Sequence, residues 1–155
     1  LADYFHRCAV WGIFPSFFNG DTFEDGQWKI ARFFDIPALC ERVRPLYKQF
    51  IPILRRMHDA GWQPITYART AAAGVQIERY GAGPGGELLL AVFNGGQAAV
   101  VAKVTVDAQA LGLAGTARAA SLAIPRDLVV ASAGTSLIVD VPVEAGRCEV
   151  VSLLP

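Results

Sequence analysis

The stretch from residue 75 to residue 106 reads VQIERYGAGPGGELLLAVFNGGQAAVVAKVTV and decides the expected fold. It contains three runs of strand length that are rich in apolar and β-branched residues. The runs are residues 75–80, 87–94 and 98–106. Glycine-rich turns at 81–86 and 95–96 separate them, and such short connections join antiparallel neighbours. The stretch therefore predicts a series of β-hairpins.

The same pattern extends to both sides of this stretch. Further strands are expected at residues 65–69, 116–124, 128–131, 136–141 and 148–153, with a longer connection at 107–115. About eight short strands at this spacing are typical of an antiparallel sandwich of two sheets. A βαβ architecture is disfavoured here because no long helical run follows residue 62.

The first part of the chain has a different composition. All but three of the aromatic residues lie in residues 1–62. An apolar run at 10–18 indicates a buried strand, and residues 19–28 follow it as a loop. The sequence therefore predicts two regions, an aromatic strand-loop-helix segment at 1–62 and an antiparallel β-sandwich at 63–155.

A helix is expected in the second half of this segment. Asp35 can cap it, Pro37 suits its first turn, and apolar residues then recur every three or four positions as far as Met57. Pro45 predicts a break and Pro52 a kink, because an internal proline removes a hydrogen bond and collides with the preceding turn. Gly61 is expected to end the helix in a left-handed cap, with Trp62 folding back on Met57.

Charge and cysteine usage exclude several function classes. Fourteen basic and fourteen acidic residues cancel, so nucleic-acid binding is not expected. No apolar run is long enough to cross a membrane, and the sequence indicates a soluble chain without deciding whether it is secreted. Cys8, Cys40 and Cys148 lack metal-ligand spacing, so neither a metal nor a cofactor is expected. Free thiols and a single disulfide both remain open.

Three stretches together resemble the C-terminal end of bacterial glycoside hydrolases that join a (β/α)8 barrel to a β-sandwich. They are AGWQPITYA at 60–68, VQIERYG at 75–81 with LLLAVFN at 88–94, and VDVP at 139–142 continuing through 146–147 to VVSL at 150–153. The resemblance implies that residues 1–62 are the last strand and helix of such a barrel. The implied fold is mainly β with an N-terminal helical segment, of the α+β class.

The resemblance also implies that the catalytic part of the enzyme is missing. A complete barrel needs about 250 residues and carries its catalytic carboxyl groups on loops after several strands. We therefore expect a non-catalytic accessory module that binds an oligosaccharide or polysaccharide. Two alternatives stay open: a catalytic unit completed by other barrel segments, and a module that self-associates through its aromatic segment.

Candidate sugar-contacting residues lie in the aromatic segment. Asp21, Glu24, Asp25 and Trp28 fall in the expected loop, where carboxylates beside an aromatic ring suit the hydroxyls and apolar face of a sugar. Trp11 could extend a stacking platform with Phe14, Phe17, Phe18 and Trp28. The alternative interpretations are a solvated loop for the acids and core packing for the aromatic side chains. In the catalytic alternative, Asp21, Glu24 or Asp25 would serve as acid or base.

Overall fold

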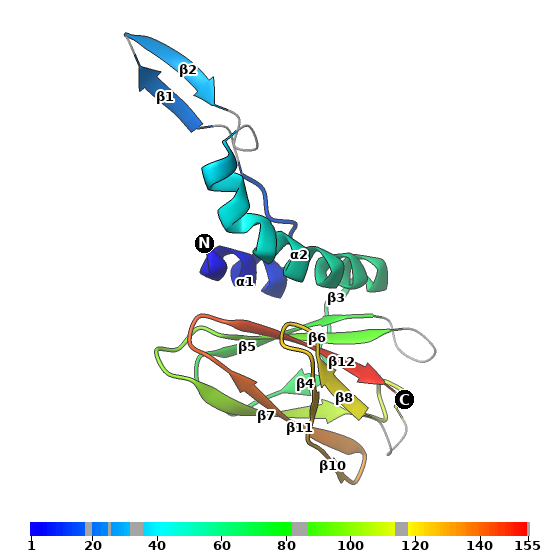
Figure 1. Ribbon diagram of the computed structural model, residues 1–155. Helices are drawn as coiled ribbons and strands as arrows, with labels where there is room; N and C mark the ends of the chain where they lie inside the picture. Colours follow the sequence, from blue (N-terminus) through cyan, green and yellow to red (C-terminus); the bar gives the residue numbers. More distant parts are fainter. Residues whose placement is uncertain (18–19, 25, 32–35, 82–86, 114–117, 155) are drawn as a thin grey trace.

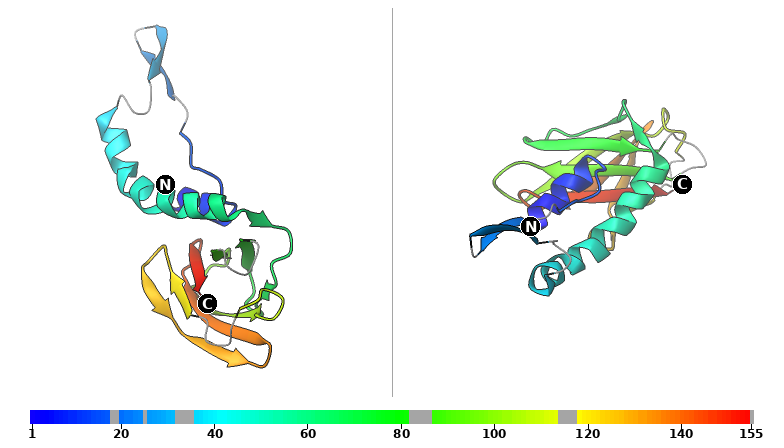
Figure 2. Two further views of the ribbon diagram at one scale, coloured as in Figure 1. Left: turned by 90° about the vertical axis from the view of Figure 1, so that its right-hand side faces the viewer. Right: turned by 90° about the horizontal axis from the view of Figure 1, so that it is seen from above.

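The fold has three layers and a projecting hairpin (Figures 1 and 2). The computed structural model describes residues 1–17, 20–24, 26–31, 36–81, 87–113 and 118–154. Two helices, α1 (Ala2–Val10) and α2 (Pro37–Ala60), cover one face of a six-stranded sheet, and a four-stranded sheet covers its other face. The hairpin pairs β1 (Gly20–Glu24) with β2 (Gln27–Ala31). The expected mainly β fold with an antiparallel sandwich and a helical N-terminal part is confirmed.

The two sheets of the sandwich are antiparallel throughout. Their strands are β3 (Trp62–Gln63), β4 (Ala68–Arg69), β5 (Val75–Tyr80), β6 (Leu88–Asn94), β7 (Val100–Asp107), β8 (Arg118–Ser121), β9 (Arg126–Leu128), β10 (Val130–Ala133), β11 (Ser136–Val143) and β12 (Cys148–Leu154). The six-stranded sheet has the order β3-β5-β6-β12-β8-β9, and the four-stranded sheet has the order β10-β11-β7-β4.

Most strand predictions agree with these bounds. The strand expected at 75–80 is β5, and those expected at 87–94, 98–106, 136–141 and 148–153 are β6, β7, β11 and β12 with ends shifted by one or two residues. The single strand expected at 128–131 is wrong, because β9 belongs to one sheet and β10 to the other. The chain crosses between the sheets at Val129.

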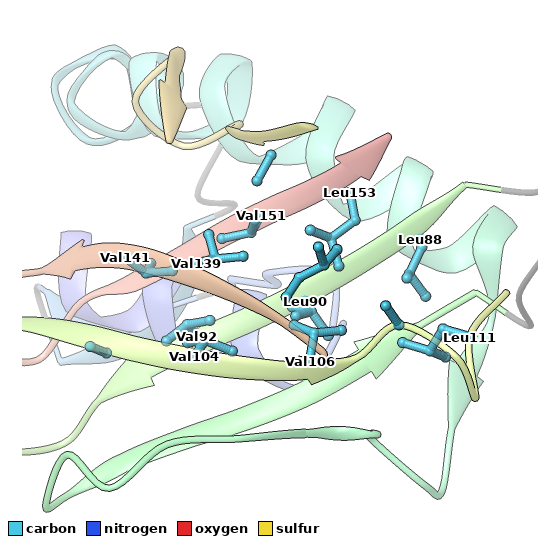
Figure 3. Close-up of a cluster of buried hydrophobic side chains, with 14 of the residues drawn as sticks. Leu88, Leu90, Val92, Val104, Val106, Leu111, Val139, Val141, Val151 and Leu153 are labelled. Atoms are coloured by element: carbon cyan, nitrogen blue, oxygen red, sulfur yellow. The ribbon is translucent and has the colours of Figure 1, made fainter. Parts of the chain in front are cut away.

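Alternating apolar residues build the core between the sheets (Figure 3). Leu88, Leu90 and Val92 of β6 point into it, where they meet inward-facing valines of β7 and β11. The intervening residues Leu89 and Ala91 are equally buried but face the helices. Because β6 is covered on both sides, its LLLAVF run is continuous and does not alternate with polar residues.

A second core lies between the helices and the six-stranded sheet. Phe5 of α1 and Phe50 of α2 are completely buried there, and the ring of Phe5 meets that of Tyr47 edge to face at 5.1 Å between centroids. Burial of each such side chain contributes about 1.5–3 kcal/mol. The aromatic first part is therefore packed on the sandwich. The boundary expected between residues 62 and 63 stays a prediction.

Two local expectations for the start of the aromatic segment were wrong. The buried strand expected at 10–18 is not formed in its described residues: helix α1 runs to Val10, and a turn follows at Trp11 and Gly12. An apolar run of this length fits either element, and its periodicity alone does not separate them. The loop expected at 19–28 instead contains β1 and the start of β2, paired around a tight turn that includes Gly26.

Helix α2 is continuous through both of its internal prolines. Pro37 occupies its first turn as expected, but the break expected at Pro45 is absent and the helix bends instead (Figures 1 and 2). The residue at the N-cap is Ile36, and Asp35 lies outside the described residues. Gly61 ends the helix at φ +80°. Trp62 enters β3 rather than folding back on Met57, and its indole N–H donates to Glu78 at 2.8 Å.

Candidate functional site

The structure separates the residues predicted to contact sugar. Asp21 and Glu24 lie on β1 and Trp28 lies on β2, where Trp28 is paired with Phe23. Asp25 and Phe18 lie outside the described residues. This hairpin stands at the N-terminal end of α2, away from the sandwich (Figures 1 and 2). Trp11 lies at the end of α1, which packs on the six-stranded sheet, whereas the hairpin points away from that sheet (Figure 1).

The aromatic platform expected around Trp11 is also divided. Phe17 packs into the second core against Tyr4 and Tyr47, with centroid distances of 5.6 and 6.0 Å. Phe14 lies edge to face with His58 at 6.2 Å. Core packing is therefore the correct interpretation for Phe17, whereas Trp11 is 55% exposed.

Trp11 forms one wall of a surface hollow of about 460 Å³. The hollow lies where the end of α1 meets the turn between β6 and β7 and the turn between β11 and β12. Its side chains and turn glycines include Arg7, Trp11, Gln76, Phe93, Gln97 and Gly146. We refer to it as the Trp11 hollow.

The backbone holds Trp11 in place through a helix-ending motif. The N–H of Ile13 donates to the carbonyl of Cys8 at 2.9 Å, and the N–H of Gly12 donates to that of Ala9 at 3.2 Å. These two bonds, with Gly12 at φ +63°, constitute a Schellman motif. Trp11 is the C-cap residue of this motif, so its position is fixed by the end of the helix.

Tyr80 of β5 fixes the same helix end to the sheet. Its hydroxyl donates to the carbonyl of Val10 at 3.0 Å. Burial raises the pKa of the Tyr80 phenol, so this hydroxyl stays a neutral donor. The ring lies so close to Gly12 that a β-carbon there would approach the hydroxyl oxygen to 2.8 Å. Only glycine combines this approach with a positive φ.

Asn94 organises the floor of the Trp11 hollow. Its fully buried side chain donates to the carbonyls of Ala98 and Val143 at 2.8 and 3.1 Å, and accepts from the N–H of Gly96 at 2.9 Å. Its backbone N–H and carbonyl bond Arg147 and Gly146 across the neighbouring turn. One side chain therefore ties together both turns that line the hollow.

The hollow offers an aromatic face beside polar groups. Arg7, Gln76 and Gln97 are exposed, and within the described part of the chain their side chains make no hydrogen bond or ion pair. A flat indole face suits the axial C–H groups of a pyranose, while amide and guanidinium groups suit its hydroxyls. This combination of groups has the chemistry that suits an uncharged or acidic sugar.

His6 lies beneath this surface, one turn before the end of α1. Its Nδ1 accepts from the N–H of Cys148 at 3.1 Å, and its ring lies edge to face with Phe50 at 4.8 Å. Burial lowers the pKa of His6. Donation from Nδ1 to the carbonyl oxygen of Cys148, 3.2 Å away, opposes this shift because it favours the protonated ring. The neutral ring is therefore the form that fits the folded protein, which makes His6 a structural link between α1 and β12.

Sequence reasoning missed the polar residues of the hollow. Gln76 and Asn94 lie in predicted strands and Gln97 follows the predicted turn at 95–96, but their grouping depends on pairing between distant segments. The Asn94-Gly95-Gly96 run was a usable signal, because an asparagine before two glycines is typical of a turn organised by a side-chain hydrogen bond.

The described residues form no cluster of metal ligands. No three His, Cys, Asp or Glu residues of this part lie close enough to hold a metal ion. Cys8, Cys40 and Cys148 are all free, so the open question of a disulfide is decided for this structure. Neither helix that the structure describes is long and apolar enough to cross a membrane.

Comparison with known proteins leaves the family open. No protein-family model, curated protein or solved structure matches the chain. The resemblance to glycoside hydrolases therefore stays a prediction based on the three quoted stretches.

Proposed function

We propose that this chain is a non-catalytic accessory module that binds carbohydrate through the Trp11 hollow. The observation that carries the proposal is an exposed tryptophan, whose backbone is fixed by a helix end, beside glutamine and arginine side chains without partners in the described part of the chain. Rigid aromatic anchors with a polar surround favour binding, because little conformational entropy is lost.

The proposal extends to the parent protein. The resemblance to the end of a bacterial glycoside hydrolase gives the module a role, which is to hold substrate near a catalytic barrel and to stabilise that barrel. Both helices already cover one face of the six-stranded sheet. A barrel partner would therefore contact their outer surfaces or the hairpin.

Calorimetric titration with soluble neutral and acidic oligosaccharides tests the proposal. We expect Trp11→Ala to weaken binding about tenfold, the effect of losing one stacked ring. Trp62→Ala is the matched control, because Trp62 is exposed to 57% but lies on β3 outside the hollow. The absence of binding to every oligosaccharide, or an equal loss of affinity in both variants, would contradict the proposal.

Exposed apolar side chains favour a second candidate function, self-association. Leu1, Tyr4, Ile13 and Phe14 are all exposed, and all belong to α1 or to the segments that flank it. Exposed apolar side chains gathered in one region of a protein can mark protein contacts. Light scattering over a range of concentrations tests this function, and a mass that stays at 16.6 kDa would exclude it.

A further inference from the structure

A second hollow lies on the outer face of the four-stranded sheet, with a volume of about 280 Å³. Pairing register explains which side chains surround it. Arg69 of β4 is opposite Thr105 of β7, and Asp107 of β7 is opposite Ser136 of β11. Since alternate residues of a strand share a face, these four side chains lie outside. Their neighbours Val106 and Leu137 point into the core.

Tyr67 forms the aromatic wall of this hollow. Its backbone has φ +50°, the one positive value among the non-glycine residues that the structure describes. Such a conformation is unfavourable for a bulky residue and persists only where the surroundings hold it. The N–H of Asp107 donates to the Tyr67 carbonyl at 2.8 Å, which fixes the strained residue to the end of β7.

The guanidinium group of Arg79 packs against the ring of Tyr67. This arginine is nearly fully buried, and it donates to the carbonyls of Ile65 and Gly81 at 2.7 Å each. Its guanidinium carbon lies 5.4 Å from the centre of the Tyr67 ring. The ring is thus held by a rigid cation and remains partly exposed toward the hollow.

The charged side chains that line the hollow have opposite signs and sum to no net charge. Arg69 and Asp107 contribute one positive and one negative side chain, and within the described residues they form no ion pair with each other. Thr66, Thr105 and Ser136 add hydroxyl groups. A charged ligand would meet one repulsive group, whereas a neutral ligand rich in hydroxyls can donate to Asp107 and accept from Arg69.

We propose that this Tyr67 hollow is a second carbohydrate site, which binds a neutral pyranose unit stacked on the Tyr67 ring. It is independent of the Trp11 hollow. Strand β7 begins after the turn that lines the Trp11 hollow and ends at Asp107, seven steps later, which corresponds to about 23 Å at the rise of a strand. Two sites so separated, on different sheets, would let one module hold two glycan chains and gain avidity.

Residue-specific NMR titration tests this proposal on the ¹⁵N-labelled full chain. The probes are cellohexaose, xylohexaose and mannohexaose, each titrated separately into the Trp11→Ala variant. At least one probe should shift the amide signals of Tyr67, Arg69, Thr105 and Ser136. Tyr67→Asn and Arg69→Gln in the same background should weaken that binding about tenfold.

Asparagine tolerates a positive φ, so Tyr67→Asn removes the ring with little backbone cost. Arg69→Gln is a second, exposed variant that keeps the test valid if Tyr67→Asn unfolds. Arg42→Gln on α2 is the charge-matched control and should leave the shifts unchanged.

Absence of shifts around Tyr67 with all three probes, or shifts that survive both variants, would overturn the second site. Shifts confined to Gln76 and Gln97 in the unmodified protein would support the Trp11 hollow alone, so the two proposals fail separately.

Discussion

Replacement of Gly12 by alanine tests how the end of α1 is built. Gly12 has φ +63°, and a β-carbon there would lie 2.8 Å from the Tyr80 hydroxyl oxygen and 2.9 Å from Cε1 of the same ring. The left-handed conformation costs a non-glycine residue about 1–2 kcal/mol. Overpacking against the buried ring adds about 1–3 kcal/mol. We therefore expect Gly12→Ala to lower the free energy of unfolding by about 2–5 kcal/mol.

Gly134 provides the control for the backbone contribution. It has φ +62°, and a β-carbon there would meet nothing within 4 Å. Gly134→Ala should therefore cost only the conformational part, about 1–2 kcal/mol. Urea unfolding of both variants, followed by circular dichroism, gives the difference. Equal losses in the two variants would refute the reasoning that Tyr80 and Gly12 require each other. Binding through Trp11 should weaken only in Gly12→Ala.

Three further predictions concern buried polar groups. Asn94→Ala should destabilise the fold by about 2–4 kcal/mol, because the buried carbonyl of Val143, the carbonyl of Ala98 and the N–H of Gly96 all lose the hydrogen bond to this side chain. Urea unfolding measures the loss, and Gln97→Ala, at an exposed position, should cost little. The pKa of His6 is lowered by burial, so the unfolded chain takes up a proton first and stability should fall as pH drops below about 6.5. His6→Asn should flatten that dependence in melting experiments, and an unchanged slope would contradict the assignment. The pKa of Glu149 is raised by burial, although Ser121 donates a hydrogen bond to its carboxylate. The protonated side chain should therefore stabilise the fold fully below about pH 4.5, and this stabilisation should decline as pH rises through the raised pKa. Glu149→Gln should remove this pH-dependent decline. If Glu149→Gln is less stable than the unmodified protein by the same amount at every pH, Glu149 does not cause the decline.

The sequence was informative where local pattern and final environment agree. Strand β5 and the turn after Asn94 were predicted from residue type alone, because a run rich in β-branched and aromatic residues and a Gly-Gly pair are local signals of a strand and a turn. Residues 10–18 were misassigned because aromatic and small apolar residues fit a buried strand as well as the end of a helix. The Schellman hydrogen bonds to the carbonyls of Cys8 and Ala9 show that this segment is the end of a helix. The amino-acid composition of the segment does not reveal these backbone bonds.

The candidate site was only partly predictable. Trp11 was identified by its chemistry, but its separation from Glu24 and Trp28 depends on the course of the chain between two helices. Gln76 and Gln97 come together through pairing of β5 with β6. Such long-range pairing is not visible in a window of neighbouring residues.

The double coverage of β6 has a consequence for protein engineering. Leu89, Ala91 and Val150 are shielded by α1 and α2. A truncated domain that begins at residue 63 would expose that apolar surface to solvent and would be prone to aggregation. The smallest domain that can be fused to another polypeptide without exposing this surface therefore begins at α1, and the fusion point should precede Ala2.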